Sequence, residues 1–231
     1  MASGTLHIVA TPIGNLGDIT YRAVEVLRGV DLIAAEDTRH TGVLLKHHGI
    51  GTRQIPYHDH NKKKITPLLL AELKGGKNIA VVADAGTPGI SDPGYYLIRE
   101  CLSHDIEVIS VPGASSLLTG LVISGLPTDR FCFEGFLPRS TGKFRKRLGE
   151  LRDDSRTLVF FESPHRLGKT LAAMLDIFGD RRAYVGRELT KKFEQSYRGT
   201  LADLLNHFKN KAPKGECVLI VAGRQTRPRI G

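Results

Sequence analysis

The stretch that decides the fold is IAVVA at residues 79–83, followed without a break by DAGTPGISDPG at 84–94. A short aliphatic run that ends in Asp and Gly is typical of a buried strand whose carboxyl end opens into a turn. The loop holds three Gly and two Pro in eleven residues, whereas a plain strand-to-helix connection usually takes about 2–6 residues. Ligands bind at such strand ends in α/β sheets. The stretch therefore predicts a ligand-binding loop, with an ordinary connection as the alternative.

Three further apolar runs extend this pattern through the first half of the chain, at residues 6–10, 30–35 and 106–111. Between the runs at residues 79–83 and 106–111, four residues keep the spacing of one helix face (Leu97, Ile98, Cys101, Leu102). Alternating strands and helices predict βαβ units with a mostly parallel sheet. Because unusual residues follow each run, we expect the loops that carry them to meet at one edge of that sheet.

The second half predicts further strands at residues 131–136, 157–161, 183–186 and 217–222, with an additional, antiparallel strand within 193–199. Ser163 and Pro164 are a helix start signal, and Thr200 is the expected cap of another helix. We place a domain boundary near residues 112–114, which gives α/β domains at 1–113 and 114–231. No Ser/Gly linker marks the boundary, so a tight interface between the domains is expected.

Composition limits the classes of protein. The 231 residues carry a net charge of +9 and a pI near 9.6, which favours a polyanionic partner such as nucleic acid. No apolar run approaches the ~20 residues that span a bilayer, and the first residues resemble no signal peptide, so we expect no membrane association. The cysteines lie far apart and form no zinc spacing, as in a reduced cytosolic protein (Cys101, Cys132, Cys217).

Two clusters of cations are candidates for RNA contact. Five cations lie within nine residues beside Phe144, a density that suits a phosphate backbone, with a solvated helix face as the alternative (Arg139, Lys143, Arg145, Lys146, Arg147). A second basic segment at residues 62–64 follows His58 and His60. These histidines have no third ligand at a suitable spacing, so we predict no metal site.

A series of motifs carries a family resemblance. In chain order these are TPIGNLGDIT (11–20), AAEDTRHT (34–41), DAGTPGISDPG (84–94), VPGASS (111–116), SGLPTDRFCFEGFLP (124–138), FFESPHR (160–166), RELTK (187–191) and KGE (214–216). The chain resembles the tetrapyrrole methylase superfamily, and within it the branch that methylates small-subunit ribosomal RNA. The match covers nearly the whole chain, and so many motifs in one order are highly specific.

The resemblance implies a class III methyltransferase: a cytoplasmic homodimer of two α/β domains, with S-adenosyl-L-methionine bound in the cleft between them. It further implies 2′-O-methylation of a cytidine ribose in the decoding region of 16S rRNA, within the 30S ribosomal subunit. Family members often continue into a small helical C-terminal domain, whereas this chain stops soon after Gly223.

The resemblance also implies which residues contact S-adenosyl-L-methionine (Ile13, Ala85, Gly86, Thr87, Ile90, Ser115 and Ser116 in the first domain, and Phe161, Glu162, Leu189 and Thr190 in the second). The two serines would also suit a plain helix cap, and one helix end can serve both roles. The residues themselves are compatible with this ligand. No GxGxxG or GxxxxGK[ST] motif is present, which disfavours a dinucleotide site and a P-loop.

Methyl transfer to a ribose hydroxyl requires positioning of the reactants and a base that removes the hydroxyl proton. The candidate bases are Asp37, oriented by Arg39, and three residues of the second half, Glu162, His165 and Lys191. Structural roles are open for several of them. Asp37 and Arg39 would also form a helix-cap salt bridge, and Glu162 with His165 would suit a helix start. The sequence does not decide among these candidates.

Two other functions stay open on the residues alone. One is methylation of a small tetrapyrrole or corrin precursor, against which the basic cluster argues because tetrapyrrole carboxylates need few cations. The other is a non-enzymatic RNA-binding module, which the elaborate loops at the strand ends disfavour.

Overall fold

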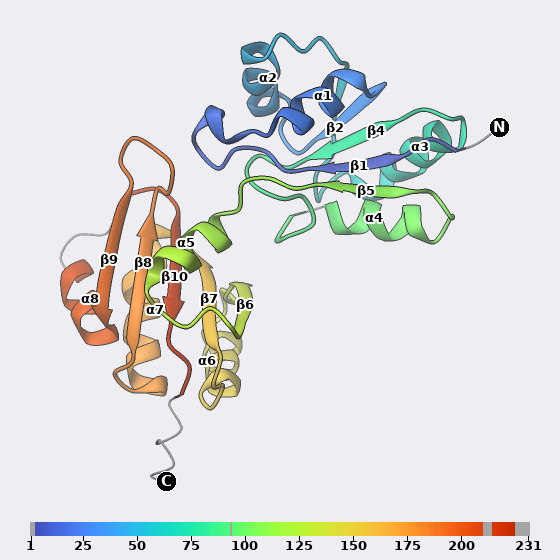
Figure 1. The fold of residues 1–231 in the computed structure, drawn as a ribbon. Coiled ribbons are helices and arrows are strands. Elements are labelled where there is room, and N and C mark those ends of the chain that lie inside the picture. The colour runs from blue at the N-terminus through green and yellow to red at the C-terminus, as the bar shows by residue number, and fades with distance from the viewer. Residues whose placement is uncertain (1–2, 93, 210–213, 225–231) are drawn as a thin grey trace. The chain divides into compact units, whose positions relative to one another are not determined.

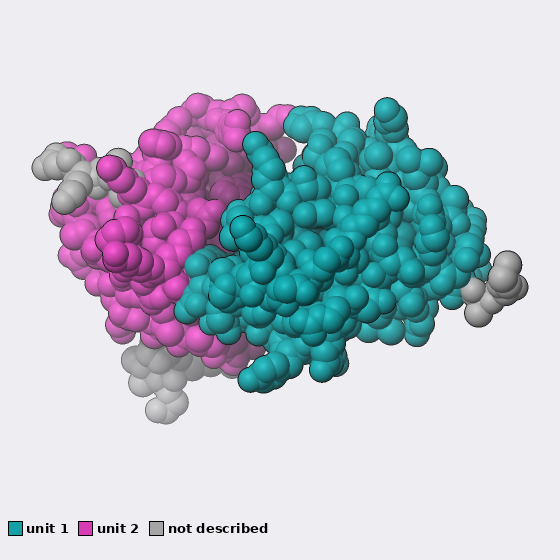
Figure 2. Space-filling view, turned by 90° about the horizontal axis from the view of Figure 1, so that it is seen from above, with its two compact units in different colours: residues 1–115 teal, residues 116–231 magenta. Residues whose placement is uncertain are grey.

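The structure is a computed structural model that describes residues 3–92, 94–209 and 214–224. The chain forms two compact units, residues 1–115 and 116–231 (Figure 2). The division falls between Ser115 and Ser116, two residues later than the boundary that we placed between 113 and 114. Each unit is described by itself below.

Unit 1 contains a five-stranded sheet with the order β3-β2-β4-β1-β5, and all its pairings are parallel. The strands are β1 (Leu6–Val9), β2 (Leu32–Ala35), β3 (Gln54–Pro56), β4 (Ile79–Val82) and β5 (Val108–Val111). The helices are the short 3₁₀ helix η1 (Leu16–Asp18) and α1 (Tyr21–Gly29), α2 (Thr38–His47), α3 (Lys62–Lys74) and α4 (Gly94–Leu102). The predicted parallel sheet is thus confirmed in this unit.

The helices of unit 1 cover both faces of its sheet (Figure 1). Leucines of α1 and α2 pack on one face with Val9 and Ile33. Leucines of α3 and α4 pack on the other face with Leu6 and Ile79. The connection from β1 to β2 runs through α1 on the first face, and the connection from β4 to β5 runs through α4 on the second face. Since β1 and β4 are neighbours in the sheet, their carboxyl ends form the topological switch point where α/β proteins bind ligands.

Unit 2 contains a five-stranded mixed sheet with the order β6-β7-β10-β8-β9. Its strands are β6 (Phe131–Phe136), β7 (Thr157–Glu162), β8 (Arg182–Arg187), β9 (Gln195–Thr200) and β10 (Cys217–Val221). The β6–β7 pair is parallel, and the other pairs are antiparallel. The α/β class is confirmed, but the expected mostly parallel sheet is wrong for this unit. A short turn after β8 returns the chain as the antiparallel β9, and β10 inserts between β7 and β8.

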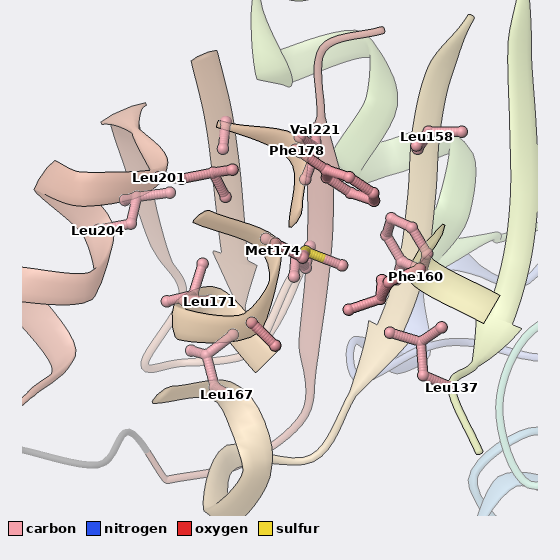
Figure 3. Packing of buried hydrophobic residues seen from close by; sticks show 14 of the residues in the cluster. Leu137, Leu158, Phe160, Leu167, Leu171, Met174, Phe178, Leu201, Leu204 and Val221 are labelled. Atoms are coloured by element: carbon pink, nitrogen blue, oxygen red, sulfur yellow. The ribbon is translucent and has the colours of Figure 1, made fainter. Parts of the chain in front are cut away.

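The core of unit 2 lies mainly on one face of this sheet, under α6 (Thr141–Leu151), α7 (Pro164–Phe178) and α8 (Leu201–Phe208). Figure 3 shows Met174 of α7 directed toward Phe160 of β7, and Leu167 and Leu171 of the same helix belong to the same cluster. The helix α5 (Ser116–Ser124) packs on the opposite face. The predicted cap at Thr200 is confirmed, because its side chain and that of Asp203 form a reciprocal capping box.

The strands β6, β7 and β8 of unit 2 run in the same direction, so their carboxyl ends share one edge of the sheet. The register fixes this edge, since Cys217 of β10 lies opposite both Glu162 and Arg187. The predicted segments 160–166 and 187–191 are therefore neighbours in space, although 20 residues separate them in the sequence.

Candidate functional site

At the switch point of unit 1, the loops that follow β1 and β4 pair with each other. The Thr11 amide donates to the Gly86 carbonyl at 2.9 Å, and the Gly86 amide donates to the Thr11 carbonyl at 3.1 Å. The Thr11 hydroxyl also donates to the carbonyl of Ala83 at 3.0 Å. These bonds hold the two loops in a fixed relation at the edge where ligands are expected.

Gly86 is the point at which three strand-end loops of unit 1 converge. Its φ of +80° is a left-handed conformation that favours glycine. A Cβ at this position would lie 3.6 Å from Ile13 Cγ2 and 3.8 Å from the carbonyl oxygen of Ala114. The fold thus brings together Ile13, Gly86 and the segment that leads into Ser115, which the resemblance had named as cofactor contacts.

The rest of the 84–94 loop folds back on itself around Asp92. The Asp92 carboxylate accepts hydrogen bonds from the amides of Gly89 and Gly94, and a Cβ at Gly94 would lie 2.7 Å from the Gly89 nitrogen. Burial raises the pKa of Asp92 despite these bonds. Ala85 and Ile90 remain exposed on the loop and Thr87 is half-buried, so the loop offers the surface that the resemblance predicts for ligand contact.

Two carboxylates at this edge were not singled out from the sequence, Glu36 after β2 and Asp84 after β4. The Asp84 amide donates to Glu36 Oε2 at 3.2 Å, and the Asp37 amide donates to Asp84 Oδ1 at 3.0 Å. Burial raises the pKa of Glu36, and the charges of Asp84, Asp92 and Asp59 raise it further. The signal in the sequence was their position, since each directly follows a buried strand.

Asp37 takes the structural role that the sequence left open for it. It is the N-cap of α2, and its carboxylate accepts from the Arg39 amide at 2.8 Å and from the Arg39 guanidinium at 2.6 Å. The hydrogen bonds from Arg39 hold the pKa of Asp37 well below its usual range. A carboxylate with so low a pKa is a weak proton acceptor, which weighs against Asp37 as the base.

A pocket of about 200 Å³ lies beside these residues within unit 1. Its walls come from the loop after β1, the first turns of α2 and the end of β4 (Thr11, Pro12, Gly14, Leu16, His40, Thr41, Val43, Leu44, Ala83, Asp84). The sequence could not indicate it, because its walls come from three segments that are separate in the chain.

In unit 2, β7 ends at Glu162, whose carboxylate already has hydrogen-bond and ion-pair partners within the protein. The side chain of Glu162 is buried, accepts from the Ser163 amide at 2.8 Å and from the Thr170 hydroxyl at 2.6 Å, and lies 3.6 Å from Arg166 Nε. Arg166 in turn donates to the carbonyls of Leu137 and Pro138. Glu162 thus joins β7, α7 and the loop after β6, and its oxygens have structural partners.

The turn after β8 combines strain with an unpaired polar group. Glu188 and Thr190 have φ of +51° and +66°, a conformation that is costly for a β-branched residue such as Thr190. Among the described residues, the buried Thr190 hydroxyl finds no hydrogen-bond partner. Leu189 beside it is buried in the same cluster that contains Phe161. Strain and an unsatisfied hydroxyl together are typical of a ligand-contacting turn.

Lys191 closes this turn as a cation. Its Nζ lies 3.0 Å from both Glu188 Oε1 and Glu216 Oε2. Burial alone would lower the pKa of Lys191, but the hydrogen bonds to Glu216 and Glu188 outweigh it and raise the pKa above the ordinary value. A lysine that stays protonated cannot accept a proton, so Lys191 fits the role of a structural tie.

His165 differs from the other candidate bases. It is exposed at the second position of α7, and its side chain makes no hydrogen bond or ion pair with any residue in the described ranges. At the same edge, the ring of Phe161 contacts those of Phe133 and Phe136 at centroid distances of 4.9 and 5.6 Å. Phe136 is largely exposed.

The structure divides the cations of the 139–147 cluster into two groups. Arg145 forms an ion pair with Asp176 at 2.6 Å, and Arg147 binds both Glu134 and Glu150 at 2.8 Å. The others are exposed and lie near no carboxylate within the described part of the chain (Arg139, Lys143, Lys146). Arg139 follows the Leu137–Pro138 segment that Arg166 anchors at the carboxyl edge.

Neither a metal centre nor a membrane span is seen in the described ranges. No three His, Cys, Asp or Glu side chains there are arranged to hold a metal ion. None of the helices described combines the length and the hydropathy that crossing a bilayer requires.

Comparison with known proteins identifies the family to which this chain belongs. Residues 5–205 match the family model of the Tetrapyrrole (Corrin/Porphyrin) Methylases. The ribosomal RNA small subunit methyltransferase I of Synechocystis is 53% identical over 98% of this chain and 81% of its own length. The protein of the same name from Escherichia coli O157:H7 is 49% identical over 98% and 80%.

Solved structures show the same fold at low identity. The methyltransferase CobJ superposes with a TM-score of 0.72 at 18% identity, over 99% of this chain and 98% of its own. The uroporphyrin-III C-methyl transferase of Thermus thermophilus, complexed with S-adenosyl homocysteine, gives a TM-score of 0.66 at 19% identity over 94% and 97%. The predicted fold class is therefore confirmed. By these matches, the chain belongs to the tetrapyrrole methylase family and, within it, to the group of the ribosomal RNA small subunit methyltransferases I.

Proposed function

We propose that this protein is an enzyme that transfers a methyl group from S-adenosyl-L-methionine to 16S rRNA of the small ribosomal subunit, at the 2′-oxygen of a cytidine. The observation that carries the proposal is the identity of about half of all residues, along nearly the whole chain, with methyltransferases named for small-subunit rRNA. The net charge of +9 suits such a polyanionic substrate. The small-molecule and non-enzymatic alternatives have no comparable support.

The residues present fit S-adenosyl-L-methionine on two observations. In unit 1, the absent side chain of Gly86 leaves a space bounded by Ile13 and the Ala114 carbonyl. In unit 2, the strained Thr190 keeps a buried hydroxyl without a partner among the described residues. We assign contacts to the predicted set, with Glu162 positioning its neighbours rather than touching the ligand (Ile13, Ala85, Gly86, Thr87, Ile90, Ser115, Ser116, Phe161, Leu189, Thr190).

The ligand and the protein contribute different parts of the methyl-transfer reaction. S-adenosyl-L-methionine supplies a methyl group that its sulfonium already activates. The protein must hold the ribose hydroxyl in line with that methyl and accept the hydroxyl proton. Among the four candidates we assign the proton acceptor to His165, because the carboxylates of Asp37 and Glu162 and the amine of Lys191 are tied to other groups.

The test is transfer of a labelled methyl group to 30S subunits that lack the modification, followed by nucleoside mapping. We expect incorporation at one 2′-O-methylcytidine, with none into free precorrin. Methyl incorporation into precorrin without any into 30S subunits or 16S rRNA would refute the proposal. Running naked 16S rRNA in parallel identifies which form of the substrate is used.

We further propose that the protein acts in the cytoplasm as a symmetric homodimer. Twice the chain mass of 25.3 kDa gives a particle of about 50 kDa. Light scattering at micromolar concentrations should show this mass, and a monomer throughout that range would contradict the dimer.

A further inference from the structure

We propose that the 200 Å³ pocket of unit 1 receives the nucleobase of the acceptor nucleotide, and that Asp84 recognises the amino group of cytosine there. The inference rests on the proposed function and adds to it the site that selects the target base. The pocket contains residues of the β1 loop, α2 and β4, and it includes none of the predicted cofactor contacts.

The size of the pocket suits a single base. Pockets for whole small molecules usually measure about 300–1,000 Å³, so one of about 200 Å³ is too small for a tetrapyrrole or a complete cofactor. Enzymes that do chemistry on a base take it out of the stack and hold it in a close-fitting pocket, and a pocket of this size could hold the base of a nucleotide that is methylated on its ribose in the same way. Leu16, Val43 and Leu44 supply apolar walls for the faces of a ring.

Among the polar residues that line the pocket, Asp84 carries the carboxylate that can select among bases. Asp84 Oδ1 accepts from the Asp37 amide, whereas Oδ2 has no hydrogen-bond partner among the described residues. A carboxylate accepts a hydrogen bond from the cytosine N4 amino group, but it faces the O4 acceptor of uracil unfavourably. The neighbouring carboxylate of Glu36 makes the edge repel phosphate, so a base can enter here and the RNA backbone cannot.

The position of the pocket also suits the reaction. Pro12 and Gly14 line it, while Ile13 between them is directed to Gly86, in the region that we assign to the cofactor. The base pocket and that region therefore lie against the same short segment of the β1 loop. A base held on one side of this segment keeps its ribose near the methyl group, as in-line transfer requires.

The decisive variant is Asp84→Asn, tested on 30S subunits whose mapped target is either cytidine or uridine. The amide side chain of this variant keeps an oxygen for the Asp37 amide, so the loop should fold, but it offers an amino group that pairs with uracil O4. We expect the wild type to prefer cytidine by about 10–100-fold in kcat/KM, equivalent to ~1–3 kcal/mol for one base contact. The variant should lose or reverse this preference and bind S-adenosyl-L-methionine normally. An unchanged preference would overturn the inference.

A second pair of variants tests the pocket without touching Asp84. Val43→Trp fills the pocket from its rim, and Lys46→Trp places the same side chain on an exposed position of α2 outside the lining. We expect Val43→Trp to reduce methyl transfer at least tenfold with cofactor affinity retained, and Lys46→Trp to leave both unchanged. Equal activity of the two variants would overturn the inference. A wild type that methylates no 30S subunit would instead refute the proposed function.

Discussion

The cofactor site that we propose in unit 1 depends on Gly86, because the backbone conformation and the missing side chain of this residue act together. We predict that Gly86→Val abolishes S-adenosyl-L-methionine binding in isothermal titration, since a branched side chain both disfavours a φ of +80° and fills the space beside Ile13. The variant should still fold, because no atom lies closer than 3.6 Å to the added Cβ.

Gly49 provides the matched control for Gly86. It has a similar φ of +61°, but nothing lies within 4 Å of its Cβ position. Gly49→Val should therefore lose comparable stability to backbone strain and keep its cofactor affinity. If both variants bind S-adenosyl-L-methionine as the wild type does, the 84–94 loop is not the cofactor site.

His165 is the candidate base that the structure leaves available. We predict that His165→Ala lowers kcat for methyl transfer by ~10²–10⁴, the range for a lost general base, with little change in cofactor affinity. Added imidazole should restore part of the rate. Lys169→Ala, one helical turn along the exposed side of α7, is the control and should be as active as the wild type. Full activity of His165→Ala would show that another group accepts the hydroxyl proton.

The sequence predicted candidate residues better than it predicted their roles. Asp37, Glu162 and Lys191 were found by their positions after strands, and the structure brings each to the expected edge. Their roles depend on partners distant in sequence, such as Thr170 for Glu162 and Glu216 for Lys191. One-dimensional spacing contains no information on such contacts. Asp84 was missed as a binding group for the same reason, since its importance comes from the pocket.

At the scale of elements, Tyr57 joins the end of β3 to α3. Its ring is buried, and its hydroxyl lies 3.0 Å from the Thr66 hydroxyl on α3. Burial raises the pKa of Tyr57 to about 12 from an ordinary value of 10.0. Because the unfolded chain then releases a proton more readily than the folded one, stability should fall as the pH rises from 10 to 12.

We predict that Tyr57→Phe flattens this loss of stability at alkaline pH. At pH 7 the variant should be less stable by about 1 kcal/mol for the missing hydrogen bond. Above pH 10 it should lose less stability than the wild type, by up to ~2–3 kcal/mol for about two pKa units. Urea unfolding at several pH values measures both effects. Tyr21→Phe, at an exposed position, should follow the wild type, and parallel pH profiles for Tyr57→Phe would contradict the prediction.

Strands rich in aliphatic residues were predictable, whereas a strand with few of them and the position of an inserted strand were not. The strands β1, β4 and β7 were found because each consists mostly of apolar residues. β3 was missed, since Gln54–Pro56 has one aliphatic residue and owes its conformation to pairing with β2. The run that forms β10 was recognised, but not its antiparallel insertion between β7 and β8, because strand order depends on packing across the whole sheet.

At the scale of the molecule, net charge follows from composition, but the charge available to RNA follows from the fold. Arg145 and Arg147 are neutralised by carboxylates of α7, β6 and α6. Arg139, Lys143 and Lys146 are exposed and lie near no carboxylate in the part of the chain described. A cation that is already paired must give up its partner before it binds phosphate, so the second group should dominate RNA contact.

We predict that replacing Arg139, Lys143 and Lys146 with Ala reduces the dependence of 30S affinity on salt. Each lost phosphate contact removes one released counterion, so the slope of log K against log salt should flatten by about 2–3. The control removes the same charge from unit 1, by replacing Arg22, Arg53 and Lys74, which are exposed outside the cluster. It should change the slope by less than one unit. Equal slopes for both triple variants would show that net charge alone drives association. An unchanged slope for the first variant would show that other cations, such as Lys63 and Lys64, make the phosphate contacts.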